Sequence, residues 1–291
     1  MNELLQLTED SGIERGAMKR ALWVTMLACF ALVSGKALAQ VPALPDGTQT
    51  HWVMSQPEEI VAHLTFDPAT VQRRLPPSLR FITLKELAAG GVVWAADYLH
   101  EHPSHGRWGI SFFEIVRMTT FEIDEHAPDW PEHGAAALWC ARVASSDSTR
   151  DLGPGKPLLV LDFWMPDSAY TAYMRERGHY ATYADVCLLQ EPEGKWLGTV
   201  DVDGLSVVAE CTLAGPITGG VGSAGMQMLF PPRSSTVVKI VRVAFAGHRE
   251  QQCTEGASWR FHGTHPLANG IIVGPSTFQF GYDLIGGAYQ W

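Results

Sequence analysis

Short apolar segments separated by turn residues run through most of the chain, and they constrain its fold more than any other feature. From residue 107 to 287, segments rich in aromatic and β-branched side chains recur at intervals of roughly 8 to 15 residues. Turn-forming stretches such as EPEG and DVDG join several of them. This spacing is typical of an antiparallel β-barrel or sandwich, and such a barrel can enclose a ligand cavity. We therefore predict a mainly β fold with peripheral helices.

The expected elements follow from local patterns. We expect strands at residues 90–99, 107–123, 135–144, 156–165, 183–190, 196–204, 205–215, 235–247, 255–263 and 276–287. Helices are expected after Asp67, which would cap the first, and around residues 167–178, where Asp167 or Ser168 would cap the first backbone N–H groups. The stretch 215–228 is rich in glycine and is expected to be a loop, without the strand-to-helix context of a phosphate-binding motif.

The N-terminal 39 residues have the pattern of a secretory signal peptide. Lys19 and Arg20 precede an apolar run, and Ala37 and Ala39 form a small-residue cleavage site before Gln40. Met18 is a second candidate start. We expect residues 1–39 to be a signal peptide, 40–54 an extended lead-in and 55–291 one domain; the alternative is an uncleaved anchor. The protein is thus expected to be secreted or periplasmic, touching a membrane only through that segment.

Composition excludes one class of partner. The formal net charge is −10, so no nucleic-acid partner is expected. With 46% hydrophobic and 18% charged residues, the chain is expected to form a substantial core. After cleavage four cysteines remain: Cys140, Cys187, Cys211 and Cys253. They form one or two disulfides in an oxidising compartment, or they are buried thiols. No C-x-x-C spacing occurs, so a structural zinc site is not expected. No cofactor is predicted either.

Several stretches in the same order resemble the acetoacetate decarboxylase superfamily. They are FDPATVQRRLPPSLRF, GGVVWAADYLH, the segment GHYATYADVCLLQEPEGKWLGTVDVDGLSVVAECTL, STVVKIVRV, and the C-terminal EGASWRFHGTHPLANG…STFQFGYDLIGG. The resemblance covers roughly residues 55–287. It implies a β-barrel or cone with an internal active-site cavity, a small keto- or carboxylate-bearing ligand, and a homo-oligomer as in many family members.

The family's reactive lysine is missing. Family members form a Schiff base on a lysine whose pKa is lowered by its apolar surroundings and a cationic neighbour; this lysine is a standard example of an activated amine nucleophile. The paired lysines of the motif fall on Ala181 and Thr182, a family arginine falls near Pro57, and one family carboxylate falls at Ala95. Another carboxylate is matched by Glu114. The resemblance therefore predicts the fold without the Schiff-base chemistry.

Other lysines are weak substitutes. Lys85, Lys156 and Lys195 lie in polar or turn-like segments and are expected to be solvated. Lys239 matches a lysine on a family strand, and we expect it to form an ion pair because an unpaired buried charge is costly.

The candidate site is therefore built on general acid–base groups. If Glu114 faces the cavity, burial raises its pKa and suits proton transfer; the alternative is that it faces outward. His179 is the second catalytic candidate. The predicted substrate-binding residues are Tyr180, Ala181, Thr182, Tyr183 and His265.

Three functions follow from this pattern. One is a lyase or isomerase that uses acid–base residues. Another is a non-enzymatic ligand-binding protein on the same scaffold, in which the polar and aromatic residues simply line the site. The third is a metal enzyme built on His100, His102 and His105, which Pro103 places in a loop. No Gly-x-Ser-x-Gly motif is present, so a serine hydrolase is not expected.

Overall fold

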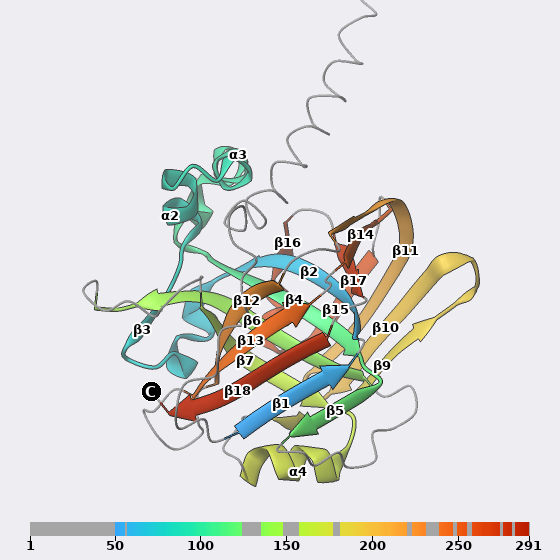
Figure 1. The fold of residues 1–291 in the computed structure, drawn as a ribbon. Coiled ribbons are helices and arrows are strands. Elements are labelled where there is room, and N and C mark those ends of the chain that lie inside the picture. The colour runs from blue at the N-terminus through green and yellow to red at the C-terminus, as the bar shows by residue number, and fades with distance from the viewer. Residues whose placement is uncertain are drawn as a thin grey trace, which may run out of the picture.

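The chain folds mainly into strands with a few peripheral helices, as predicted (Figure 1). The computed structural model describes residues 50–55, 57–123, 135–147, 157–176, 181–219, 223–230, 239–246, 249–254, 258–273, 276–280 and 283–290. The predicted signal peptide and most of the lead-in lie outside these residues, as do His179 and Tyr180. No helix among the described residues is long and apolar enough to span a membrane.

The strands fall into a barrel, a second sheet and short accessory pairs. The barrel strands are β1 (Thr50–Ser55), β2 (Glu58–Phe66), β4 (Gly109–Arg117), β5 (Thr120–Ile123), β6 (Ala135–Ser145), β7 (Leu158–Met165), β12 (Ser223–Phe230), β13 (Lys239–Ala246) and β18 (Asp283–Gln290). The others are β3 (Leu79–Phe81), β8 (Thr182–Tyr183), β9 (Asp185–Gln190), β10 (Lys195–Val202), β11 (Leu205–Gly219), β14 (Arg249–Cys253), β15 (Ser258–Gly263), β16 (Ile271–Ile272) and β17 (Thr277–Phe280). The α-helices are α2 (Leu84–Ala89), α3 (Val93–Glu101) and α4 (Ser168–Glu176).

Two pairs of consecutive strands complete the ring of the barrel. β1 precedes β2 and pairs with β5, which follows β4, and β2 pairs with β4 along its whole length. From β4 the pairing continues through β6, β7, β12, β13 and β18 and returns to β1. Every step is antiparallel except β7–β12, which is parallel. β1 falls mostly in the expected lead-in, yet it is a barrel strand because β5 and β18 supply its hydrogen-bonding partners.

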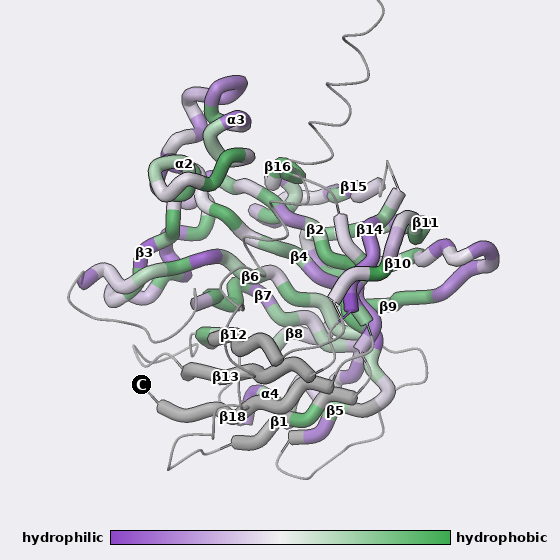
Figure 2. Tube along the Cα trace, turned by 45° about the horizontal axis from the view of Figure 1, so that its top comes forward, coloured by the Kyte–Doolittle hydropathy of each residue, from purple (hydrophilic) through white to green (hydrophobic). Residues whose placement is uncertain are grey.

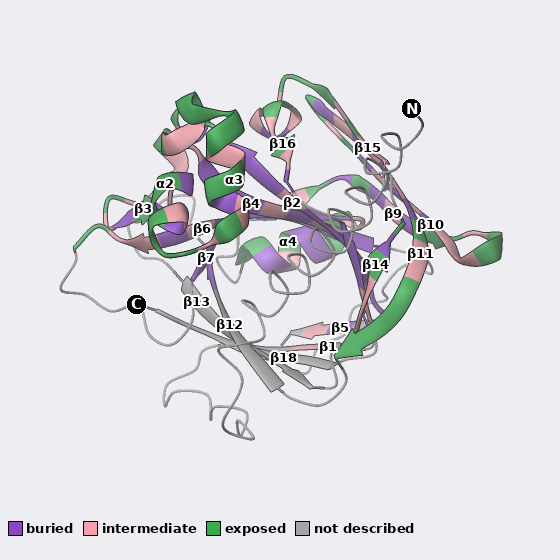
Figure 3. Cartoon of the chain, turned by 90° about the horizontal axis from the view of Figure 1, so that it is seen from above, coloured by how far each residue is buried: buried purple, intermediate pink, exposed green. Residues whose placement is uncertain are grey.

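A second sheet covers one outer wall of the barrel. It consists of β9, β10, β11 and β15, and its apolar residues pack against alternate residues of β2, β4, β6 and β7. We call this apolar contact the packed layer; its largest fully buried side chains include Trp139, Trp196, Phe66 and Phe113. Figure 3 shows buried residues along β2 and β4.

Successive residues of these shared strands therefore point to opposite sides. In β4, Phe113 and Ile115 belong to the packed layer, whereas Val116 belongs to a separate cluster with residues of β5, β6, β7, β12 and α4. Because side chains alternate along a strand, the even-numbered residues of β4 lie on the barrel interior. In Figure 2 hydrophobic residues recur along β2, β4 and β6.

Helix α4 lies across one end of the barrel. Figures 1 and 3 place it below the strands and within their ring when the molecule is seen from above. Of the two predicted caps, Asp167 is confirmed: the Tyr170 backbone N–H donates to its carboxylate at 2.7 Å. Tyr170 and Met174 are fully buried and pack with the interior residues, and Tyr170 stacks on Phe121 of β5. The helix thus closes that end with apolar side chains.

Two predicted elements are wrong. Residues 90–99, expected to be a strand, contain most of α3, because Ala95, Tyr98 and Leu99 recur at helical spacing around a small core that the α2–α3 pair forms with Ile110. The glycine-rich stretch 215–228, expected to be a loop, contains the end of β11 and six residues of β12. There, pairing with β14 and β13 outweighs the low strand propensity of glycine.

The helix expected after Asp67 is shorter than predicted. Two 3-10 turns, Pro68–Thr70 and Gln72–Arg74, replace it, although Asp67 caps the first and Pro68 occupies its first position as predicted. The chain then enters β3, so no room remains for a longer helix.

The four cysteines form one disulfide and leave two free thiols. Cys211 and Cys253 form a disulfide between β11 and β14, whereas Cys140 and Cys187 are free. The bond closes a segment with a sequence separation of 42 residues and ties together two strands at the edge of the packed layer.

Candidate functional site

Glu114 lies on the interior face of the barrel. Its partners in the neighbouring strands are Val61 of β2 and Leu138 of β6, and Leu138 in turn pairs with Phe163 of β7. Residues that are opposite each other in paired strands project to the same face of a sheet. Leu138 and Phe163 belong to the interior cluster, so Glu114 points into the barrel rather than into the packed layer.

The position of the missing lysine lies on the same face. Thr182 pairs with Trp164, so Ala181 comes at the level of Phe163 and Glu114. Ala181 is fully buried in the interior cluster beside α4, and its carbonyl oxygen accepts a hydrogen bond from Arg175 Nε at 2.6 Å. A methyl group therefore occupies the position that the sequence resemblance assigns to the reactive amine, and a carboxyl group faces the same interior.

Four further polar residues share this face. Residues 59 and 63 of β2 alternate with residues of the packed layer, as do residues 140 and 142 of β6. The four are Glu59, His63, Cys140 and Arg142. Glu59 and Cys140 are buried, and His63 and Arg142 are half-buried. The inner wall of β2, β4 and β6 thus combines two carboxyl groups, an imidazole, a thiol and a guanidinium.

Burial and like charge act together on Glu114. Removal from water, and secondarily the nearby Glu59, raise the pKa of its carboxyl group well above the ordinary value. Glu59 pairs with Val116, two residues from Glu114 on the same face, so the two glutamates are diagonal neighbours. Such neighbours have Cα atoms about 7–8 Å apart, within reach of two long side chains. A carboxyl group with a raised pKa keeps its proton at higher pH and can donate it.

The pKa values of the two basic groups are shifted downward. Burial, with the positive charge of Arg142 as a second cause, lowers the pKa of His63 to about 4. Burial also lowers the pKa of Arg142 to about 10. Hence His63 is a neutral imidazole at neutral pH and Arg142 is a cation. Burial, then the charges of Glu114 and Asp162, raise the pKa of the Cys140 thiol well above its usual range, so this cysteine is not a thiolate nucleophile.

An unsatisfied hydroxyl adjoins this wall. Thr277 of β17 pairs with Val61, which itself pairs with Glu114, so all three project to the same face. Thr277 is 4% exposed. Within the described part of the chain its Oγ1 has no hydrogen-bond partner. A buried hydroxyl without a partner is costly, and a ligand group is one means of satisfying it.

Thr182 and Tyr183, two further predicted site residues, do not face the barrel interior with Glu114. Thr182 pairs with Trp164, a residue of the packed layer, so it projects to the opposite face from Ala181. Tyr183 is 56% exposed. His179 and Tyr180 lie outside the described residues, and their predicted roles stay predictions.

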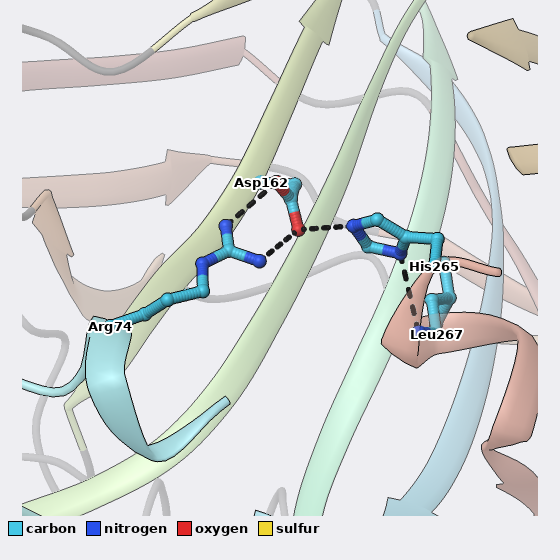
Figure 4. A network of polar contacts seen from close by, with 4 residues as sticks. All are labelled: Arg74, Asp162, His265 and Leu267. Atoms are coloured by element: carbon cyan, nitrogen blue, oxygen red, sulfur yellow. Dashed lines mark hydrogen bonds and ion pairs between the residues drawn. The ribbon is translucent and has the colours of Figure 1, made fainter. Parts of the chain in front are cut away.

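His265 belongs to a polar network beside the packed layer, shown in Figure 4. Its Nδ1 accepts the backbone N–H of Leu267 at 3.2 Å, and its Nε2 lies 3.3 Å from a carboxylate oxygen of Asp162. Arg74 donates to both oxygens of the same carboxylate, at 2.7 and 2.9 Å. Both ring nitrogens of His265 are thus engaged, and the residue joins the turn at 266–269 to β7. These contacts favour a structural role over ligand contact.

The described lysine side chains offer no replacement amine. Lys85 is exposed on α2. Lys195 forms ion pairs with Glu191 and Glu210 on the surface. Lys239 is the first residue of β13, but its side chain and the whole of Lys156 lie outside what the structure describes, so the ion pair expected for Lys239 stays a prediction.

The histidine-rich loop forms an aromatic stack. His102 stacks on His105, which stacks on Trp108 with ring centroids 3.8 Å apart, and Tyr98 Oη lies 2.9 Å from His105 Nδ1. Among the described residues no group of three or more His, Cys, Asp or Glu side chains is arranged to hold a metal ion. The stack accounts for these histidines as packing around the end of α3.

Sequence reasoning found Glu114 but missed the residues around it. Glu59, His63 and Arg142 stand at alternate positions within apolar strands, in EEIVAHLTF and ALWCARV. Polar residues that share the period of two with a known interior position were a usable signal. Thr277 could not be found in this way, since only the pairing of β17 with β2 brings it to this wall.

Comparisons with known proteins identify the fold. No protein-family model matches the sequence, and no curated protein matches it. Among solved structures the chain is similar to an acetoacetate decarboxylase, with a TM-score of 0.51, 13% identity, and coverage of 86% of this chain and 91% of the other. It is also similar to the acetoacetate decarboxylase from Legionella pneumophila, with a TM-score of 0.51, 14% identity, and coverage of 87% and 94%. At this identity the likeness establishes the shared fold.

Proposed function

We propose that this protein, built on the acetoacetate decarboxylase fold, binds a small metabolite with carbonyl or carboxylate oxygens inside its barrel and handles protons there without an amine. The observation that carries the proposal is the inner wall of β2, β4 and β6. There a carboxyl group with a raised pKa faces an interior in which Ala181 stands in place of the family lysine. Binding of a small molecule agrees with this fold, and we propose lyase-type proton transfer as the chemistry.

The charges of the wall favour an anionic or oxygen-rich ligand. Arg142 supplies a half-buried cation, and charge-assisted hydrogen bonds to carboxylates are among the strongest that proteins make. Glu114 supplies a proton donor on the same wall. A ligand that carries a carboxylate and a carbonyl, as keto acids do, offers partners for both. Proton donation to the carbonyl would then assist enolisation or dehydration.

Binding and chemistry are tested separately. Acetoacetate and pyruvate serve as probes in calorimetric titrations of the wild-type protein and of Arg142→Gln. We expect wild-type binding and at least a tenfold weaker affinity in the variant, about 1.4 kcal/mol, because the carboxylate loses its cation. Arg260→Gln, on the exposed face of β15, is the matched control and should bind as the wild type does. Equal affinity in all three proteins would argue against the barrel site.

The absence of Schiff-base chemistry has its own assay. Wild-type protein incubated with acetoacetate and borohydride should show no substrate trapped on a lysine and no release of carbon dioxide above the uncatalysed rate. Trapping on any lysine would restore the family mechanism and refute the acid–base proposal.

A non-enzymatic ligand-binding protein is the second candidate, favoured by the apolar closure of one barrel end by α4. A ligand that raises Tm and is recovered unchanged after prolonged incubation supports it. A ligand that is converted supports the lyase.

We also propose that the protein is secreted or periplasmic. The signal-peptide pattern supports this, and so does the disulfide Cys211–Cys253, since disulfides persist in oxidising compartments. N-terminal sequencing of the protein from its native host should begin at Gln40; an intact N-terminus on cytoplasmic protein would contradict the proposal.

A further inference from the structure

The inner wall borders open space. Glu114, His63 and Arg142 are half-buried, although burial shifts the pKa of each of them. A side chain that is surrounded by protein and still keeps accessible surface faces a cavity rather than bulk solvent. Phe112, which lies between Glu114 and Ile110 on the same face of β4, is half-buried as well. The accessible surface therefore continues along this face from Glu114 toward Arg142.

One end of this space is closed, and the other lies beside a cleft. Helix α4 covers the end near Val116 with apolar side chains, whereas α2 and α3 pack at the end near Ile110. Figure 1 shows α2 and α3 above the strands and α4 below them. Beside α2 lies an open cleft of about 240 Å³. A ligand that reaches Glu114 can therefore approach from the α2 end.

The cleft lies on the same face as the inner wall. In the β3–β6 pair, Arg80 is opposite Ala144, and the backbone N–H of Ile82 donates to the carbonyl oxygen of Arg142 at 3.0 Å. Val143 belongs to the packed layer, so these four residues project to the other side. Ala144 lines the cleft, and it lies two residues, about 7 Å, beyond Arg142 along β6. The floor of the cleft thus continues the inner wall past Arg142.

The lining of the cleft is apolar, with one ion pair at its rim. Four of the residues that line it are apolar: Ile82, Leu87, Val92 and Ala144. The first three also pack with the small core of α2 and α3. Arg80 and Glu86 line the cleft too, and Arg80 donates to the Glu86 carboxylate, so their charges compensate each other. Such a lining suits an aliphatic group better than a second charged group.

The size of the cleft suits part of a ligand. Pockets for drug-sized ligands usually measure about 300–1,000 Å³, somewhat more than this cleft. The polar groups that can fix a carboxylate or a carbonyl, Arg142 and Glu114, lie further in, along the inner wall. A ligand that uses both regions would place its oxygens inward and its chain in the cleft.

Arg142 stands where the wall and the cleft meet. Its charge is one cause of the lowered pKa of His63, so the guanidinium lies within electrostatic range of the inner wall. A guanidinium has five N–H donors, so a contact with a group of the protein still leaves donors for a ligand carboxylate. Arg142 can therefore hold the charged end of a ligand at the inner edge of the cleft.

We propose that the cleft between α2 and the β3–β6 pair holds an aliphatic chain of the ligand, whose oxygen-bearing head lies in the barrel between Arg142 and Glu114. The inference rests on the proposed function for the head group and adds the substrate class, which is a keto acid with a chain several carbons longer than that of acetoacetate or pyruvate. The ligand enters head first from the α2 end. Ala144 and Val92, which line the cleft, are specificity-determining residues for the chain.

A series of 2-oxo acids of increasing chain length tests the inference. 2-Oxobutanoate, 2-oxohexanoate and 2-oxooctanoate are titrated calorimetrically beside pyruvate. Wild-type affinity should rise about two- to fourfold for each added methylene group until the cleft is full, because each group leaves water. Equal affinities for pyruvate and 2-oxohexanoate overturn the inference and leave the proposed function standing.

Two variants narrow the cleft from different elements. Ala144→Leu on β6 and Val92→Phe before α3 should each lower the ratio of the affinities for 2-oxohexanoate and pyruvate at least about tenfold, because the chain loses its space. Ala96→Leu, at an exposed position of α3, is the matched control and should keep the wild-type ratio. Thermal unfolding shows which variants are folded, and either cleft variant alone decides. A folded cleft variant with the wild-type ratio shows that the chain lies elsewhere.

Arg142→Gln separates this inference from the proposed function. If the variant weakens the binding of pyruvate and of 2-oxohexanoate by the same factor, the head lies in the barrel and the chain contributes independently, as proposed. If 2-oxohexanoate binding depends on Ala144 but not on Arg142, the proposed barrel site fails and the cleft is a separate site. If none of these acids binds to the wild type, the proposed function and the inference fail together.

Discussion

The two faces of β2, β4, β6 and β7 differ in how they treat polar groups. On the outer face, the packed layer admits few charges, and Asp162 is fully engaged by Arg74 and His265. On the inner face, burial and the nearby Glu59 raise the pKa of Glu114, and Thr277 Oγ1 lacks a hydrogen-bond partner among the described residues. Perturbed pKa values and unsatisfied buried hydroxyls are more common at binding sites than in a packed core. Under the proposed function, the outer face serves the fold and the inner face serves the ligand.

The largest expected effect tests the packing of the two faces. Trp139 and Leu138 are neighbours on β6 with side chains on opposite faces. Trp139→Ala should destabilise the protein by about 3–5 kcal/mol in urea unfolding, because a fully buried ring is lost. Leu138→Ala should cost less, about 2 kcal/mol, if the interior wall borders space for a ligand. Equal costs would show that the interior is as densely packed as the outer layer.

A smaller effect tests the polar network of the outer face. Asp162→Ala leaves Arg74 and His265 without their anion, and unfolding experiments should show a loss of about 2–3 kcal/mol, less than for a fully buried pair because Arg74 is 29% exposed. His265→Gln should lose less. The exposed pair Arg260–Glu210 is the control, and Arg260→Ala should give no resolvable change. If Asp162→Ala is as stable as wild type but abolishes binding of acetoacetate, the functional site lies on the outer face.

The smallest expected effect concerns acid stability and the inner face. The pKa of His63 falls from 6.5 to about 4 on folding, so the unfolded chain takes up a proton that the folded chain refuses. Stability is therefore intact above pH 6.5 and declines as the pH falls toward 4. Since His63 is half-buried, the loss should be on the order of 2 kcal/mol. His63→Gln should flatten this part of the stability curve. His102→Gln, exposed at the end of α3, should not change it.

Much of the fold could be predicted because alternation and turn spacing are local properties. The strands from β4 to β7 and from β9 to β11 follow from apolar runs between turn residues. Residues 90–99 were misassigned because a short apolar run has no clear period, and only the contacts of Ala95 and Leu99 with α2 select a helix. Residues 215–228 became strands through partners remote in sequence.

The candidate site could be predicted only in part. Glu114 was found because its position in an apolar strand matches a family pocket position. Its neighbour Glu59 was missed, since β2 and β4 are separated by two helices and several turns that give no register. Thr182 and Ala181 seemed equivalent as neighbours in a motif. The pairing of β8 with β7 sends them to opposite faces, because successive side chains of a strand alternate.

The sequence by itself determined that this chain forms a strand-rich fold of the acetoacetate decarboxylase type and that no lysine stands at residues 181 and 182. Both properties follow from the order of residues along the chain, because local hydrophobic patterns and motif spacing can be read from it directly. The tertiary structure alone decided which polar residues meet. Glu59, Glu114 and Thr277 come from three strands far apart in the chain, and they share one wall because hydrogen-bonded register aligns side chains across strands. Register depends on the whole sheet, and no single segment contains it.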